Sequence, residues 1–275
     1  MSWLVTALAL LAAGALVPVG VGFCVLAVER GRPIRLTRAG ISVFAREWAA
    51  HAVAGPMLPL GVVQLAPAPF GPRDDPPDAP TPVVLVPGYA MNRACMFVLA
   101  SYLRRRGWRW VWPVNHRPHS GGLHRFAQQL GASVDRVRMV SGAEQVDLVC
   151  HSMGGVVAGL YLREYGGAVK VRRLVTLGTP WKGSRMGVFG LRQEAVEMLP
   201  TGDVVQRLDG LPVPAVAIAS DTDHMVIPPD SATPPWIRVV RLDHVGHLEM
   251  LSNARVLRLV RDLLADERFA LPEAS

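Results

Sequence analysis

The chain has 275 residues, 50% hydrophobic and 19% charged, which is enough for one large domain with a buried core but short for two. The formal net charge of +7 comes from arginines spread along the chain, without the basic stripe and binding motif of a nucleic-acid-binding protein, so we predict no nucleic-acid partner. The cysteines Cys24, Cys95 and Cys150 form neither a disulfide framework nor a CxxC metal-binding pattern.

The N-terminal segment is strongly apolar. Residues 3–28 contain no charged side chain, and this run exceeds the about 20 residues that a helix needs to cross a bilayer. No lysine or arginine precedes it and no small-residue cleavage site follows it, so we favour a retained membrane anchor over residues 1–28. A cleaved signal peptide and a buried core helix are the alternatives. Four arginines follow between residues 30 and 38, and the positive-inside rule then predicts a single-pass protein with its main domain in the cytoplasm.

Residues 29–81 read as a juxtamembrane segment and a linker. Residues 49–69 are also nearly uncharged, but His51, Gln64 and four prolines argue against a second span. If this stretch did cross, the main domain would lie on the exported side. Residues 71–81, GPRDDPPDAPT, cannot form the interior of a helix or a strand, so the main domain is predicted to span residues 82–275.

From residue 82 onward, short apolar runs alternate with helical patterns. Strands are predicted at residues 82–86, 108–114, 145–150, 171–177, 214–220 and 236–242. Helices are predicted at residues 95–106, 123–141, 153–164 and 248–267. Strands that alternate with helices and read as continuous apolar runs predict the α/β class, with a mainly parallel sheet of about six strands covered by helices on both faces.

A serine stands where the third strand meets its helix, in the stretch CHSMG (residues 150–154). A serine hydroxyl is a poor nucleophile unless a base holds it and the backbone presents it. A sharp strand-to-helix turn presents the side chain, and it needs small residues such as Gly154 and Gly155 where the two backbones approach. The stretch resembles the G-x-S-x-G nucleophile elbow of the α/β-hydrolase superfamily, and of its lipase and esterase branch in particular, with Cys150 in the first glycine position. The resemblance implies that Ser152 is the nucleophile.

The loop after the first strand, VPGY (residues 86–89), resembles the oxyanion loop of the same family. Acyl transfer places negative charge on a carbonyl oxygen, which two fixed main-chain N–H groups can stabilise. The resemblance implies that these donors belong to Met153, directly after the serine, and to Tyr89. Pro87 stands where the family commonly has histidine. This difference has little effect on the predicted oxyanion site, because the donor is the main-chain N–H of Tyr89 and not the side chain at position 87.

A cap segment is indicated after the fourth strand. Residues 177–180, LGTP, resemble the strand end that leads into the cap of many lipases. Residues 181–211 mix apolar and charged side chains with glycines, and the stretch MLPTGDVVQRL near their end is also lipase-like. We interpret residues 181–211 as a small lid that covers the acyl site and excludes water.

The acid and the base of the family follow the serine in chain order. The turn DHMV after the fifth strand implies Asp223 as the acid, with Asp221, two residues nearer the strand, as the alternative. The stretch GHLEML after the sixth strand implies His247 as the base, and His244 is the alternative.

The resemblance covers residues 82–266 and implies a serine hydrolase that cleaves carboxylic esters through a Ser152–His247–Asp223 triad and an acyl-enzyme. No cofactor and no metal are needed for this chemistry. The predicted anchor and lid favour a lipid or another acyl-chain ester as substrate. An acyltransferase or a thioesterase could use the same triad, and a catalytically silent membrane interaction module is the alternative from another functional class. The sequence leaves the oligomeric state open.

Overall fold

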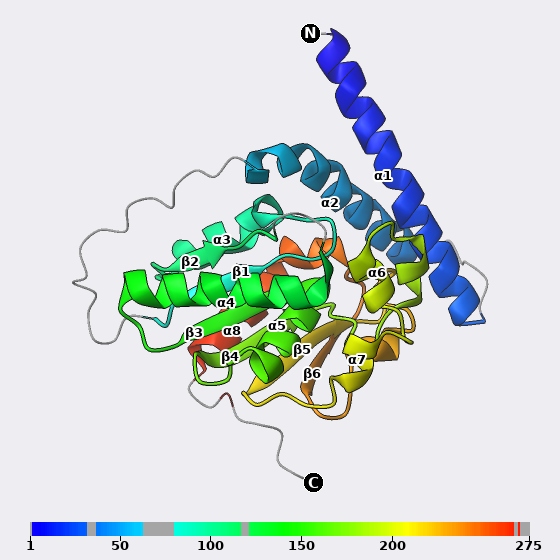
Figure 1. Ribbon diagram of the computed structural model, residues 1–275. Coiled ribbons are helices and arrows are strands. Elements are labelled where there is room, and N and C mark those ends of the chain that lie inside the picture. Colours follow the sequence, from blue (N-terminus) through cyan, green and yellow to red (C-terminus); the bar gives the residue numbers. More distant parts are fainter. Residues whose placement is uncertain (1, 32–36, 63–79, 117–120, 267–268, 270–275) are drawn as a thin grey trace.

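The structure is a computed structural model that describes residues 2–31, 37–62, 80–116, 121–266 and 269, with the backbone alone given for residues 2–5 and 7–12 (Figure 1). Most of the predicted linker at residues 71–81 lies outside the described residues.

The main domain is built on a parallel sheet of six strands in the order β2-β1-β3-β4-β5-β6. The strands are β1 (Val83–Val86), β2 (Val111–Pro113), β3 (Val146–His151), β4 (Val171–Leu177), β5 (Ala215–Ser220) and β6 (Arg238–Leu242). The predicted six-stranded parallel sheet is therefore confirmed, although β2 is shorter than its sequence pattern indicates.

Helices cover both faces of the sheet, because successive strand residues point to opposite sides. The helices are α3 (Phe97–Arg104), α4 (Gly122–Ser141), α5 (Met153–Glu164) and α8 (Ala254–Ala265). Val84 and Val86 of β1 pack with α4 and α5, whereas Val83 and Leu85 pack with α3 and α8. Figure 1 shows α4 and α5 in front of the strands and α8 behind them.

The predicted helix at residues 248–267 is divided in two. A short 3-10 helix, η4 (Leu248–Leu251), is followed by α8. The break occurs because the Asn253 side chain accepts the main-chain N–H of Arg255 at 2.9 Å and so caps a new helix start. The predicted helix at residues 95–106 likewise begins as a 3-10 helix, η1 (Arg93–Met96), before α3.

The strand order fixes where a site can form. From β1 the chain moves to β2 on one side and then to β3 on the other, so the order reverses between β1 and β3. In open parallel sheets, ligands bind at the carboxyl ends of the strands beside such a reversal. The loop after β1 and the turn after β3, which carry VPGY and CHSMG, meet at this place.

Two helices precede the sheet, α1 (Ser2–Glu29) and α2 (Arg38–Val62), and they pack on each other. Figure 1 shows the N-terminal end of α1 pointing away from the sheet. The other half of α1 covers the main domain: Val19 and Leu26 are buried, and the Phe23 ring stacks on the ring of His224 at 4.8 Å.

The structure does not support the predicted transmembrane anchor over residues 1–28. Among the residues described with their side chains, no helix is long and apolar enough to cross a membrane. Part of the apolar run is instead buried against the protein itself, from Val19 to Leu26. The predicted cytoplasmic location of the main domain stays a prediction.

Helix α2 occupies much of the segment that the sequence indicates only as a juxtamembrane stretch. Pro56 and Pro59 lie inside it, and each lacks the N–H that a helix needs. Side-chain amides of the main domain bind its end: Asn92 Nδ2 donates to the Leu58 carbonyl at 2.7 Å, and Asn115 Nδ2 donates to the Gly61 carbonyl at 2.8 Å. Tertiary contacts thus stabilise a helix that local propensity disfavours.

Candidate active site

Ser152 forms the turn between β3 and α5 in a strained conformation. Its φ is 54° and its ψ is −126°, a region that costs a non-glycine residue about 1–3 kcal/mol. Neighbouring groups hold this conformation: the Ser152 N–H donates to the Leu177 carbonyl at 2.8 Å, and its carbonyl accepts the Thr179 hydroxyl at 3.0 Å. The turn directs the serine side chain to the carboxyl edge of the sheet.

Small residues after Ser152 allow the backbones to approach. A Cβ atom on Gly154 would lie 2.6 Å from the Val86 carbonyl oxygen, and one on Gly155 would overlap the Thr179 side chain. Cys150 causes no such conflict in the first glycine position, because its side chain is buried between the sheet and helices α4 and α5. Burial raises the pKa of the Cys150 thiol well above its usual value, so this cysteine is unreactive.

The loop after β1 lies directly against the serine. A Cβ atom on Gly88 would stand 3.0 Å from Ser152 Cβ, so only a glycine allows this contact without displacement. Tyr89 follows Gly88, and Met153 follows Ser152 as the first residue of α5. The two predicted N–H donors therefore belong to the two segments that meet at Ser152. Their role in holding an oxyanion stays a prediction.

Asp223 and His247 form a buried hydrogen-bonded pair, with His247 Nδ1 2.7 Å from Asp223 Oδ2. The other carboxylate oxygen accepts the N–H groups of Met225 at 2.8 Å and Val226 at 3.0 Å, which fixes the carboxylate. Since Nδ1 donates to Asp223, His247 Nε2 is left to act as an acceptor. Gly178 lies beside the pair, where a Cβ atom would come 2.8 Å from Asp223 Oδ2.

The alternatives for acid and base lie at the surface. The Asp221 side chain is 49% exposed and pairs with Arg241 at 3.5 Å. His244 is also exposed. The structure thus brings Asp223 and His247 together, and it leaves Asp221 and His244 outside the buried pair.

The contact between Asp223 and His247 shifts the pKa of both side chains. Burial lowers the pKa of His247, but the Asp223 charge and hydrogen bond outweigh it, so the pKa of His247 is raised above its usual value. Burial raises the pKa of Asp223, yet the His247 charge and hydrogen bond hold that pKa below its usual value. An ionised carboxylate can therefore stabilise a protonated imidazole at this position.

His151 joins the serine turn to the histidine loop. Its ring lies 4.7 Å from the His247 ring, and its Nε2 lies 3.0 Å from the His247 carbonyl oxygen. Burial lowers the pKa of His151 to about 3, so the ring is neutral with its proton on Nε2. Because His151 directly precedes Ser152, this contact brings the base loop next to the serine.

Comparison with solved structures finds the same architecture in lipases. The mature Bacillus licheniformis lipase BlEst2 superposes with a TM-score of 0.59 at 15% identity, over 71% of this chain and 96% of that one. Aspergillus fumigatus lipase B gives a TM-score of 0.62 at 18% identity, over 73% of this chain and 55% of that one. The chain has the α/β-hydrolase fold. No family model matches the sequence.

A third similar structure is the monoacylglycerol lipase of Paleococcus ferrophilus, with a TM-score of 0.52 at 14% identity, over 67% of this chain and 95% of that one. At these identities the likeness establishes the fold. The residues of the site therefore have to be argued from their own geometry.

Helix α2 contacts the carboxyl edge of the sheet beside His247, which the sequence does not predict. Glu47 is fully buried, and its carboxylate accepts the N–H groups of Leu248 at 2.8 Å and Glu249 at 2.9 Å, directly after His247. Burial raises the pKa of Glu47 to about 7, although these N–H groups lower it. Next to it, Arg46 pairs with Glu249 at 2.7 Å. The sequence signal for this contact is the charged pair Arg46–Glu47 inside a mostly apolar segment.

The predicted lid of the α/β-hydrolase domain contains three short helices. They are η2 (Arg185–Phe189), α6 (Gln193–Glu197) and α7 (Asp203–Arg207). The Tyr89 hydroxyl accepts the N–H of Leu191 at 3.2 Å, so this segment contacts the loop beside Ser152. Leu191 is 98% exposed and Phe189 is 57% exposed. A mostly apolar groove of about 560 Å³ is lined by Val25, Arg185, Val188, Phe189, Leu199, Pro200 and Thr201.

Proposed function

We propose that the protein is a serine hydrolase that cleaves carboxylic esters. The observation that carries the proposal is the buried Asp223–His247 hydrogen bond at the carboxyl edge of the sheet where Ser152 forms a strained turn. An acid, a base and a presented hydroxyl are the groups that an activated serine requires. The lipase folds that the chain resembles support the same class of reaction.

In this mechanism His247 Nε2 takes the proton of the Ser152 hydroxyl as Oγ attacks the ester carbonyl. Asp223 holds the imidazole ring and stabilises its positive charge without taking the proton. The main-chain N–H groups of Met153 and Tyr89 hold the negative oxygen of the tetrahedral intermediate. His247 then protonates the leaving alcohol, and water activated by the same histidine releases the acid from Ser152. No step needs a metal or a cofactor.

A lipid or another acyl-chain ester is the substrate class that we propose. The groove between α1 and the lid has mostly apolar walls, with Val25 on one side and Val188 and Phe189 on the other. Burying an acyl chain there contributes about 0.8 kcal/mol for each methylene group removed from water. A lid that closes over the chain also excludes water from the ester.

Labelling with a fluorophosphonate tests the activated serine, because this reagent reacts with serine only where a base and an oxyanion site activate it. We expect the folded wild-type protein to be labelled, with detergent added to open the lid, and Ser152→Ala and His247→Ala to remain unlabelled. Ser133→Ala, on α4 away from the site, is the matched control and should label normally. A folded wild-type protein that does not label, or labelling that persists in Ser152→Ala, would overturn the proposal. Product analysis with an added alcohol then separates hydrolysis from acyl transfer.

A further inference from the structure

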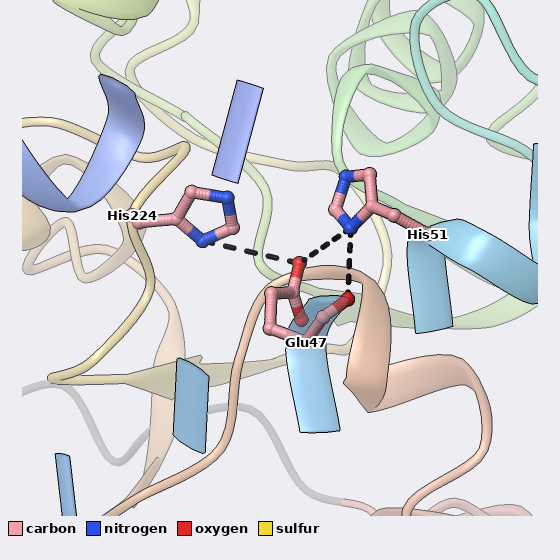
Figure 2. Close-up of side chains that lie close together, drawn as sticks. All are labelled: Glu47, His51 and His224. Carbon is pink, nitrogen blue, oxygen red and sulfur yellow. Dashed lines mark hydrogen bonds and ion pairs between the residues drawn. The ribbon is translucent and has the colours of Figure 1, made fainter. Parts of the chain in front are cut away.

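Three side chains with metal-binding atoms converge between α2 and the turn after β5. Figure 2 shows Glu47 and His51, one helical turn apart on the same face of α2, together with His224. His224 directly follows Asp223 in the chain. His51 Nδ1 is 3.4 Å from Glu47 Oε1, and His224 Nδ1 is 3.9 Å from the same oxygen. One donor atom from each residue lies within 4.8 Å of the others.

His224 lacks partners for its polar atoms in this cluster. Its ring is fully buried, it stacks on Phe23, and neither of its nitrogens has a hydrogen-bond partner among the described residues. A buried polar group without a partner costs about 1–3 kcal/mol. The distance of 3.9 Å to Glu47 is too long for a hydrogen bond, so the carboxylate does not meet this need. An ion or a molecule bound between Glu47 and His224 would give the His224 nitrogen a partner.

We propose that Glu47, His51 and His224 form a binding site for a divalent transition metal of the zinc class. Two imidazole nitrogens and one carboxylate oxygen are a ligand set that zinc uses in proteins. Magnesium and calcium prefer sites made of oxygen atoms alone, so this set disfavours them. The site goes beyond the proposed esterase activity, since ester hydrolysis by Ser152 needs no metal.

The distances fit such an ion after small side-chain rotations. Zinc bonds of about 2.0–2.1 Å in a tetrahedral arrangement place neighbouring ligand atoms about 3.3 Å apart. The observed 3.4 Å between His51 and Glu47 already agrees, and the 3.9 Å to His224 needs a shift of roughly half an ångström. The donor nitrogens of the two histidines lie within 4.8 Å of each other, and rotation of the His224 ring towards Glu47 is the movement that closes the site. The fourth position can hold a water molecule, which can enter past His51, whose side chain is 20% exposed.

Two of the three donor atoms can bind a metal without losing an existing contact, and the third has one hydrogen bond to exchange. Glu47 Oε1 accepts one N–H, from Leu248, and a carboxylate oxygen has a further lone pair for a metal. His51 Nδ1 lies 3.0 Å from the Glu47 main-chain oxygen, so metal binding replaces that hydrogen bond and requires the tautomer with the proton on Nε2. The bound ion would connect α2 to the turn that carries Asp223 and to the loop that carries His247. We therefore assign it a structural role beside the active site.

The test uses tag-free, full-length protein freed of metal with EDTA. Zinc is titrated against a chromophoric chelator, and cobalt serves as a second probe because its visible absorption reports coordination by protein ligands. We expect one equivalent of zinc and an increase in melting temperature on binding. His51→Gln and His224→Gln should weaken zinc binding by more than about 100-fold, since even the outer partners of metal ligands are worth about 10–100-fold.

His124→Gln is the matched control, because His124 Nδ1 lies 3.7 Å from Glu164 Oε2 in a histidine–carboxylate pair elsewhere on the domain. Its zinc affinity should equal that of the wild type. Absence of saturable binding to the folded wild type would overturn the site. A zinc affinity of His51→Gln equal to that of the wild type would also overturn the site. This variant is the more decisive of the two histidine variants, because His51 is partly exposed and its replacement disturbs folding less than that of His224. Fluorophosphonate labelling of the metal-free protein is a separate readout, so failure here and failure of the proposed activity can be told apart.

Discussion

The carboxylate of Glu47 accepts the main-chain N–H of Leu248 at 2.8 Å, which joins α2 to the residue directly after His247. The same carboxylate accepts the N–H of Glu249 at 2.9 Å. Both donors begin the 3-10 helix η4, whose first N–H groups have no partner within the helix. Glu47 therefore positions the loop of the proposed base from outside the predicted catalytic domain.

Glu47→Ala should lower both stability and turnover. Two buried N–H groups lose their acceptor, at about 1–3 kcal/mol each, and the His247 loop can then shift. A displacement of about 1 Å in a catalytic group can reduce turnover about 100-fold, so we expect a fall of about 10- to 100-fold in kcat with little change in KM. The measurement is ester hydrolysis by metal-free protein, with urea unfolding alongside.

Glu164→Ala removes a partly exposed carboxylate on α5 and is the control, with an expected stability within about 0.5 kcal/mol of wild type. Wild-type kcat in a folded Glu47→Ala protein would show that α2 does not position the base.

Ser152→Gly should yield a protein that is inactive but more stable than Ser152→Ala. Glycine adopts the φ of 54° without strain, whereas alanine keeps the conflict of its Cβ atom with the backbone. We expect a difference of about 1 kcal/mol in the free energy of unfolding, and no fluorophosphonate labelling of either variant. Equal stability of the two variants would mean that the turn stores no strain.

Much of this arrangement could be predicted from the sequence. Continuous apolar runs identify buried parallel strands, and the helix at residues 153–164 and the strand at residues 171–177 have the observed bounds. Local patterns also indicate the turn at Ser152, the carboxylate Asp223 and the loop with His247. These features are short in sequence, and each fits a local backbone requirement, so they can be found without knowledge of distant contacts.

Features that depend on long-range contacts could not be predicted. Pro56 and Pro59 disfavour a helix locally, and α2 forms because Asn92 and Asn115, far along the chain, bind its carbonyl groups. In the sequence Glu47 is only one member of a charged pair with Arg46, and its contact with the His247 loop depends on the packing of α2. The apolar run of residues 3–28 is long enough for a membrane helix, and the packing of its part from Val19 to Leu26 on the rest of the protein depends on contacts that the sequence does not show.

Asp223→Asn should reduce kcat/KM by about 10,000-fold, the loss seen when a triad carboxylate becomes an amide. It should also move the acidic limb of the pH profile. The base acts when neutral, and the Asp223 charge raises the pKa of His247 above its usual 6.5, so wild-type activity should rise with pH through a value above 6.5. Without that charge, the residual activity should rise at lower pH.

Asp221→Asn, at the exposed alternative position, is the control, and its kcat/KM should stay within about threefold of wild type, since surface changes are usually small. A larger loss of kcat/KM in Asp221→Asn than in Asp223→Asn would instead identify Asp221 as the acid.

Acid should destabilise the fold through His151. Its pKa is about 3 in the folded protein and 6.5 as the ordinary value, so below pH 6.5 the unfolded chain binds a proton that the folded chain does not. Stability is then lost as the pH falls from neutrality towards 3, by about 2 kcal/mol at pH 5 for this one group. Urea unfolding near neutral pH and at pH 5 measures the loss. We expect it to be about 2 kcal/mol smaller in His151→Gln, which cannot titrate but can still donate to the His247 carbonyl. The same loss in both proteins would assign acid sensitivity to other groups.

The apolar side chains of the predicted lid should control which esters are cleaved. Val188 and Phe189 line the groove with exposed apolar side chains, and Leu191, two residues after Phe189, is almost fully exposed. Replacing Phe189 and Leu191 with serine removes apolar surface at about 25 cal/mol per Å², so kcat/KM for long-chain esters should fall about 10-fold or more. Hydrolysis of a short acetyl ester should stay near wild type, because an acetyl group has too little apolar surface to gain from the groove. Met139→Ser, an exposed apolar residue on α4, is the control and should leave both rates unchanged. An equal loss on short and long esters would mean that the lid shapes the catalytic residues themselves and does not bind the acyl chain.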